Sequence, residues 1–316
     1  MYRPPEAGRL EEKTMSVQTE TQAGLQQALG RSAKPSVFAS IARFARTKRM
    51  GFVGAVIVVI VAFAAVFGPV LAPYDPHSLQ LSNRLSAPSL THVFGTDEKG
   101  RDIFTRILYG ARAASIVGFG AVAVSLVMKL SVGLTSAFKG GKTDLILQRV
   151  VDAQMSIPTL TILMAAVLVL GQGYLTLIIL LGFFSGIRGS RVIRGAALSI
   201  QQNDYITAAQ ALGASDVRII LQHIMPNIFA PIMVVATVNL AATILTEASL
   251  SFLNLGLTFP AVSWGSMLAL AGLPYMMEAP WMVLFPGLAI TSVVWGINIL
   301  GDALRDVLDP RLRRGV

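Results

Sequence analysis

Long uncharged apolar stretches alternate with polar segments along the chain. The first stretch, residues 50–74, has no charged side chain and includes the run Val56–Phe67. A helix needs about 20 mostly apolar residues to cross about 30 Å of hydrocarbon. This stretch is therefore predicted to span a membrane. It lies too late in the chain and is too long for an ordinary cleaved signal peptide, so we expect it to be retained.

Further apolar stretches predict a bundle of spans. The stretch 153–187 is uncharged but too long for one span, and Gly171-Gln172-Gly173 inside it is a turn signal, so it predicts a tight hairpin. Backbone groups in lipid must hydrogen bond within their own segment, so the spans are expected to be helices. The sequence therefore predicts an all-α integral membrane protein. Its six predicted transmembrane helices cover residues 50–74, 113–138, 153–170, 174–187, 227–246 and 279–301.

Composition agrees with lipid as the solvent. The 316 residues are 53% hydrophobic and 14% charged, and there is no cysteine. Soluble domains carry about 25% charged residues. The missing cysteine excludes disulfides, cysteine-based zinc sites and a thiol nucleophile.

The net charge of +9 has two possible explanations, which are binding to nucleic acid or an excess of Lys and Arg on the cytoplasmic side of a membrane protein. With the N-terminus inside, 20 of the 26 Lys and Arg residues fall on predicted cytoplasmic segments. Basic residues gather on that side of membrane proteins. Both termini are therefore predicted to be cytoplasmic, and no nucleic-acid partner is needed to explain the charge.

Four parts follow from this topology. Residues 1–47 form a polar, disordered cytoplasmic tail, with Met15 as an alternative start. The first helix and an outer segment occupy 48–110. A transmembrane core occupies 111–303 and contains a long cytoplasmic loop, 188–226. Residues 304–316 form a second cytoplasmic tail.

The cytoplasmic loop has a helix–glycine–helix pattern. Residues 205–212 favour a helix that Asp204 can cap, and Gly213 breaks it. Ser215 or Asp216 can cap a second helix. Pro226 is then expected to end or kink that helix before the fifth span. The plainer alternative is a surface loop that only joins two spans.

The same loop resembles the "EAA" loop of binding-protein-dependent ABC importer permeases. Thr207-Ala208-Ala209, Gly213 and Ile224-Met225-Pro226 stand at the spacing of that motif, with Thr207 in place of the family's Glu. That replacement is expected to weaken one polar contact with the ATPase.

Other segments resemble the dipeptide/oligopeptide (nickel/opine) branch of the family, and specifically its C-type permease. The resemblance extends from about residue 40 to the C-terminus. Its motifs include Phe94–Asp102, Tyr109–Arg112, Glu247–Leu253, Ser263–Gly265, Ala279–Trp281, Phe285–Gly287 and Leu308–Arg311.

The resemblance implies a type I, MetI-like importer core in a bacterial inner membrane, crossed several times. The partners that it implies are a second, homologous permease, two ATP-binding subunits and a periplasmic or lipid-anchored substrate-binding protein. ATP and Mg would lie on the ATP-binding subunits, so this chain is expected to bind no cofactor or metal and to catalyse nothing. The leading substrate that the resemblance implies is a peptide, and a similar small solute, such as nickel, an opine, haem or a glycan, is the alternative. The residues implied to couple to the ATPase are Thr207, Ala208, Ala209, Leu212, Gly213, Asp216 and Pro226.

Four polar residues are candidates for the translocation path or a gate. Lys129 lies within a predicted span, and a charge there is a functional candidate unless it snorkels to the inner surface. Glu247 either caps an outer gate, anchors a re-entrant segment or fixes helix register. Asn239 and Asn298 either line the path or bond helices together.

The outer segment carries a further motif. It is expected either to contact the binding protein or to supply turn and cap chemistry. Its residues are Gly95, Thr96, Asp97, Gly100, Arg101 and Asp102.

Other function classes fit less well. Gly141-Lys142-Thr143 resembles the end of a P-loop, but Ser136 stands where the first glycine belongs and no strand precedes it. The three histidines have no metal-ligand spacing, and no hydrolase motif occurs. A secondary transporter or channel remains the alternative, although it would need several intramembrane charges or broken helices. A membrane scaffold would leave the cytoplasmic loop without a role.

Overall fold

The computed structural model describes residues 44–272 and 274–308. The chain divides into two units, Met1–Arg49 and Met50–Val316. The terminal parts of both predicted tails, 1–43 and 309–316, lie outside the described residues. Within the described ranges there is no strand, and only an isolated bridge pairs Thr96 with Asp102.

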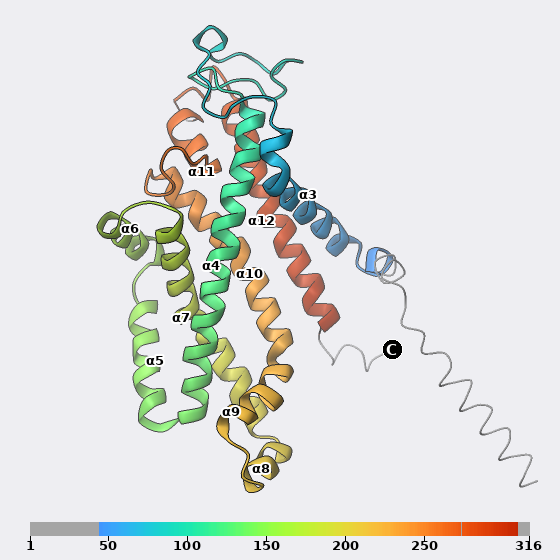
Figure 1. The fold of residues 1–316 in the computed structure, drawn as a ribbon, viewed down its shortest axis with the longest axis vertical. Coiled ribbons are helices and arrows are strands. Elements are labelled where there is room, and N and C mark those ends of the chain that lie inside the picture. Colours follow the sequence, from blue (N-terminus) through green and yellow to red (C-terminus); the bar gives the residue numbers. More distant parts are fainter. Residues whose placement is uncertain (1–43, 273, 309–316) are drawn as a thin grey trace, which may run out of the picture. The chain divides into compact units, whose positions relative to one another are not determined.

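Among the described residues, five helices are long and apolar enough to cross a membrane, and a sixth span is counted if one bent pair of helices is included. This confirms the all-α prediction (Figure 1). The spanning helices are α3 (Arg49–Leu71), α4 (Ile103–Lys139), α7 (Tyr174–Gln201), the run α9–η2–α10 (Asp216–Phe252) and α12 (Trp281–Leu308).

The bent pair corrects the predicted third span. Instead of one straight helix over 153–170, α5 (Gly141–Met155) and α6 (Thr159–Leu170) meet at an angle of 90°. Pro158 explains the break, because its ring blocks helical hydrogen bonding and disfavours helical backbone in the residue before it. The turn at Gly171–Gly173 is confirmed.

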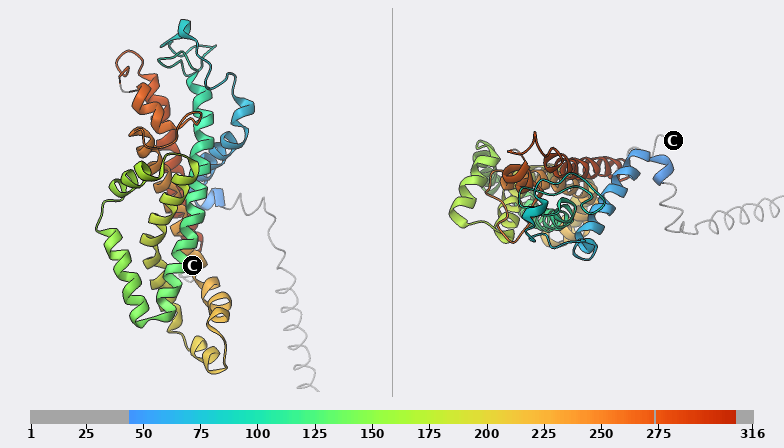
Figure 2. Two further views of the ribbon diagram at one scale, coloured as in Figure 1. Left: turned by 60° about the vertical axis from the view of Figure 1, so that its left-hand side comes forward. Right: turned by 90° about the horizontal axis from the view of Figure 1, so that it is seen from above.

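Helix α7 extends well past its predicted end at residue 187, to Gln201. Ion pairs account for this charged extension. Arg194 Nε donates to Asp144 Oδ1 of α5 at 2.7 Å, and Arg191 pairs with Asp152 about two turns further along α5. The views in Figure 2 show α5 alongside α7 and α4.

The most extensive packing between helices in the described part of the chain joins α4 to α7. A Cβ added to Gly182 would lie 2.8 Å from the carbonyl oxygen of Ala121, and one at Gly186 would lie 2.4 Å from Met128 Cβ. On α4, a Cβ at Gly133 would lie 2.7 Å from the carbonyl oxygen of Ser190. Lipid is as apolar as the side chains, so close backbone contact between small residues is a main source of helix association.

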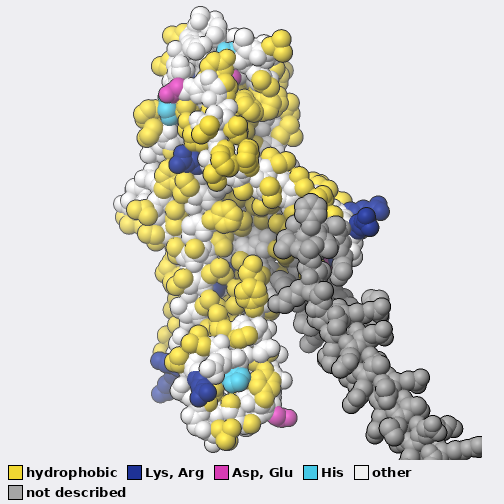
Figure 3. Space-filling model, turned by 45° about the vertical axis from the view of Figure 1, so that its right-hand side comes forward, with side chains coloured by type: hydrophobic (Ala, Val, Ile, Leu, Met, Phe, Trp, Pro, Cys, Tyr) yellow, Lys and Arg dark blue, Asp and Glu magenta, His cyan; other side chains and the backbone are white. Residues whose placement is uncertain are grey.

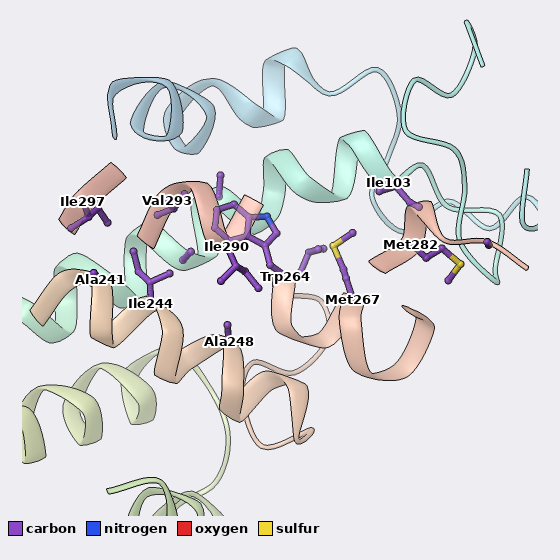
Figure 4. Packing of buried hydrophobic residues seen from close by; sticks show 14 residues of the cluster. Ile103, Ala241, Ile244, Ala248, Trp264, Met267, Met282, Ile290, Val293 and Ile297 are labelled. Carbon is purple, nitrogen blue, oxygen red and sulfur yellow. The ribbon is translucent and has the colours of Figure 1, made fainter. Parts of the chain in front are cut away.

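A second apolar core joins the N-terminal half of α4 to α10, α11 (Trp264–Ser266) and α12. Trp264 fills its centre, with its Nε1 donating to Ile107 O at 3.0 Å, and Ile290 and Val293 pack around it (Figure 4).

Helix α3 packs on α12, where a Cβ at Gly54 would lie 2.6 Å from the carbonyl oxygen of Gly296. The opposite side of α3 exposes Val59, Ile60 and Val66. Yellow apolar side chains cover much of the surface in Figure 3. This is the surface expected of helices that face lipid.

Gly182→Leu is expected to destabilise the α4–α7 pair. Overpacking a dense interface usually costs about 1–3 kcal/mol, and here the new side chain would meet backbone. Gly195→Leu on the same helix is the matched control, because nothing lies within 4 Å of its added Cβ. Thermal unfolding of the purified protein in detergent should show a lower midpoint for Gly182→Leu alone. Equal midpoints for the two variants would contradict the close contact.

Candidate coupling surface and translocation path

A compact hairpin follows α7. Its first arm is α8 (Asp204–Ala211), and Gly213 ends it with φ of +82°. The Gly213 N–H donates to Gln210 O at 2.9 Å and the Ala214 N–H to Ala209 O at 3.0 Å. These two bonds form a Schellman motif, in which the left-handed position favours glycine. The predicted helix–glycine break is confirmed.

The second arm runs without interruption into the fifth span. Ser215 caps α9 (Asp216–Ile219), its Oγ accepting from the Arg218 N–H at 3.4 Å. A π-helical stretch, η2 (Ile220–Ile224), leads directly into α10 (Met225–Phe252). Of the two expectations for Pro226, that it ends the helix is wrong, because the helical run Asp216–Phe252 continues through it. A kink at Pro226 stays a prediction. Pro226 lies in the first turn of α10, where the wider π turn has already changed the hydrogen-bond register.

The hairpin has an anchored face and an exposed face. Ile206, Ile219 and Ile224 are at most 1% exposed and pack against α4 and α7 through Ala137 and Ile193. Of the predicted coupling residues, Leu212 is 88% exposed. Thr207, Ala208, Gly213, Asp216 and Pro226 are also exposed, and Ala209 is half-buried. The arrangement presents these residues on a rigid support.

Lys129 lies deep in the α4–α7 contact. Its side chain is 0% exposed, so the snorkelling interpretation is wrong. The side chain packs against Gly189 of α7, and a Cβ there would lie 2.1 Å from Lys129 Cε. No hydrogen-bond partner for Nζ is found within the described part of the chain.

Asn239 belongs to a line of polar groups that crosses three helices. Its Nδ2 donates to Ser125 Oγ of α4 at 3.1 Å, and Ser125 Oγ donates to Ser185 Oγ of α7 at 3.4 Å. Beside it is a cavity of about 190 Å³ between α6, α7 and α10. Asn298, by contrast, is exposed on α12 and does not join this group.

Glu247 is buried near the C-terminal end of α10 and hydrogen bonds to the segment that follows. Its Oε1 accepts from Ser251 Oγ at 2.7 Å and from Ser263 Oγ at 2.9 Å. The returning chain packs closely, because a Cβ at Gly265 would lie 2.0 Å from Ala248 O. The carboxylate therefore holds the segment 253–266 against α10; whether this segment is re-entrant stays a prediction.

The outer motif is built from turn and cap interactions. Asp97 Oδ1 accepts from the N–H groups of Lys99 and Arg101, each at 2.9 Å, and Arg101 Nε donates to Asp97 Oδ2 at 2.7 Å. Asp102 caps α4 by accepting from the Thr105 N–H at 2.8 Å.

Two glycines and two aromatic side chains complete the motif. Gly95 and Gly100 have φ of +74° and +73°. The Trp281 indole donates to Thr96 O at 3.1 Å, and His92 Nδ1 lies 2.9 Å from Asp102 Oδ1. Any contact with a binding protein at this motif stays a prediction.

Sequence reasoning missed part of the polar group around Asn239. Ser125, Ser185, Arg188 and Thr159 come from three different helices, and none belongs to a recognisable motif. Only Pro158 gave a signal, since a proline inside an apolar stretch indicates a break that brings Thr159 to the cavity.

Comparison with known proteins gives consistent similarities. A model of the family "Binding-protein-dependent transport system inner membrane component" matches residues 129–314. A model of the "N-terminal TM domain of oligopeptide transport permease C" matches residues 36–88.

Two relatives are each 38% identical to this chain and cover 85% of it and 88% of their own length. They are the oligopeptide transport system permease OppC of Bacillus subtilis and the dipeptide transport system permease DppC of Alkalihalophilus pseudofirmus. Among solved structures, the inward-facing MetNI methionine ABC transporter matches with a TM-score of 0.51 and 20% identity. The match covers 64% of this chain and 96% of that one, and it supports the fold alone.

Glu247→Ala is expected to destabilise the packing of segment 253–266 by about 1–3 kcal/mol, because the hydroxyls of Ser251 and Ser263 would lose their buried acceptor. Glu278→Ala, at an exposed carboxylate, is the control. Limited proteolysis within 253–266 and thermal unfolding should both separate the variants. Equal resistance of both variants would show that the carboxylate does not hold this segment.

Proposed function

Because the chain belongs to the family of binding-protein-dependent transport system inner membrane components, we propose that it is one permease subunit of an ATP-driven peptide importer. It forms part of a path across the membrane and receives its energy through the hairpin after α7. The observation that carries this proposal is the hairpin's division into a face locked to the bundle and a face that is exposed.

The locked face makes the hairpin suitable for transmitting force. A partner that pushes on Leu212 or Asp216 would move α7 and α10 together, because Ile206, Ile219 and Ile224 are packed into the bundle. Tightly packed elements shift as units rather than deforming locally. A loop that only connected two spans would need no such anchoring.

We infer that the partners are a second, related permease, two ATP-binding subunits and an external substrate-binding protein. The family supports ATP-binding and substrate-binding partners in general. ATP and Mg are proposed to bind the ATP-binding subunits, so that this chain catalyses nothing itself. The membrane is proposed to be the bacterial inner membrane, with both termini and the hairpin in the cytoplasm. The distribution of basic residues supports this orientation.

A peptide is the proposed cargo. The support is that relatives 38% identical over most of this chain are named oligopeptide and dipeptide permeases. The broken α5–α6 pair also lies beside a polar cavity, as expected where irregular backbone lines a path within a membrane.

The test begins with purification of the tagged chain from its native membrane in mild detergent, followed by mass spectrometry. Recovery of a second permease and one or two ATPases is expected. The complex, reconstituted in liposomes with the binding protein, should import labelled peptide only when ATP is supplied. Recovery of the chain alone, with uptake independent of ATP, would favour a secondary transporter.

Gly213→Val is expected to uncouple ATP hydrolysis from uptake. The left-handed backbone disfavours a branched side chain by about 1–2 kcal/mol, and the exposed turn would change shape. Gly140→Val is the matched control, because Gly140 has φ of +56°, no atom lies within 4 Å of its added Cβ, and it lies in the turn between α4 and α5. Uptake per ATP hydrolysed should fall for Gly213→Val only.

Leu212→Asp provides a second variant that leaves the backbone unchanged. Loss of a buried anchor at an interface usually costs at least about 2 kcal/mol, so binding of the ATPase should weaken roughly 30-fold. Normal binding of the ATPase and normal uptake by this variant would contradict the assignment of Leu212 to the coupling surface.

A further inference from the structure

The cavity beside Asn239 has the composition of an anion site. It is about 190 Å³ in volume and lies where the bend between α5 and α6 meets α7 and α10. Its polar lining consists of Thr159, Ser185, Arg188, Asn239, Thr243 and Thr246, and no Asp or Glu lines it. Donors therefore outnumber strong acceptors.

Arg188 supplies a cation that no carboxylate neutralises within the described ranges. Its Nη2 donates to Thr159 Oγ1, which is a neutral acceptor. The neighbouring arginines differ, because Arg191 pairs with Asp152 and Arg194 pairs with Asp144. Among the three arginines on this part of α7, the one that lines the cavity is the one left without an acidic partner.

Lys129 adds a second cation behind the cavity wall. Gly189 lines the cavity, and the Lys129 side chain lies against it, with Nζ 3.1 Å from the position of an added Cβ. The Nζ atom is buried without a hydrogen-bond partner among the described residues. A buried cation without a counterion is strongly unfavourable, so an anion in the adjacent cavity would stabilise it.

The N-terminus of α6 reaches the same place. No side chain caps this 12-residue helix, and its first residue, Thr159, lines the cavity. Unpaired N–H groups and the helix dipole favour negative charge at such an end. The break at Pro158 is what allows a helix to begin at this depth.

We propose that this cavity binds the carboxylate of the translocated substrate, most simply the free C-terminal carboxylate of a peptide. Arg188 and Thr159 would contact it directly, while Lys129 would contribute charge through the thin wall at Gly189. The inference rests on the proposed function. It adds that the path recognises a negatively charged carboxylate of the substrate. The compact volume suits one end of a peptide rather than a bulky anion.

The test uses the assembled membrane complex without its binding protein, so that only the path is probed. Equilibrium dialysis would compare one radiolabelled dipeptide as the free acid and as its C-terminal amide. Lys129→Met and Arg188→Gln remove each cation, and Arg149→Gln removes an exposed one on α5 as the control. Size-exclusion chromatography would verify that every variant assembles.

The wild-type complex and Arg149→Gln should bind the acid roughly tenfold more tightly than the amide, as charge-assisted hydrogen bonds predict. Lys129→Met and Arg188→Gln should lose most of that preference by weakening binding of the acid alone. Equal binding of acid and amide by the wild type, or no binding of either, overturns the proposal. Equal weakening of both ligands in Lys129→Met would also overturn it, since that result indicates a packing role or a pair with the second permease.

ATP-dependent uptake by the full wild-type importer separates this test from the proposed function. If the importer shows ATP-dependent uptake but the dialysis shows no preference for the acid over the amide, only the proposed carboxylate site is contradicted. If uptake does not depend on ATP, the assignment as an ATP-driven importer is itself contradicted.

Discussion

The close contact between α4 and α7 is the constraint on which the rest of the structure depends. Gly182 and Gly186 let the two backbones approach until an added Cβ would overlap the facing helix. In lipid the hydrophobic effect does not drive helices together, so association relies on close packing and polar contacts. The same approach buries Lys129 against Gly189 and brings Ser125 next to Ser185. The polar interior of the bundle is therefore a consequence of small residues on one helix face.

The broken third span packs on the α4–α7 pair. Helix α5 is fastened to α7 by the Asp144–Arg194 and Asp152–Arg191 pairs, while Pro158 turns α6 away at 90°. Satisfied charges allow α7 to continue as a helix beyond the apolar stretch. The bend leaves the first turn of α6 facing a cavity rather than lipid, where unpaired backbone groups would be costly. The break at Pro158, the cavity beside Asn239 and the cations Arg188 and Lys129 therefore lie close together in one part of the bundle.

The hairpin and the outer segment differ in how their motif residues are supported. On the hairpin, the recognisable residues Thr207 to Gly213 are mostly exposed, and the buried side chains of Ile206, Ile219 and Ile224 hold them in place. In the outer segment, the motif residues themselves form the structure, since Asp97 and Asp102 bind backbone N–H groups. A motif can thus mark a binding surface or a turn, and only its surroundings distinguish the two.

The sequence by itself determined the membrane class, the glycine break at Gly213 and the family, because these depend on hydrophobic length, local backbone preference and contiguous motifs. It also identified Lys129, Glu247 and Asn239 as unusual polar residues. Only the tertiary structure decided that Lys129 is fully buried, that Glu247 holds a returning segment and that Asn298 lies apart from Asn239. The same holds for the length of α7, whose arginines pair with acids some 40–50 residues earlier. Contacts between helices depend on which faces meet, and neither hydropathy nor the spacing along one helix records that.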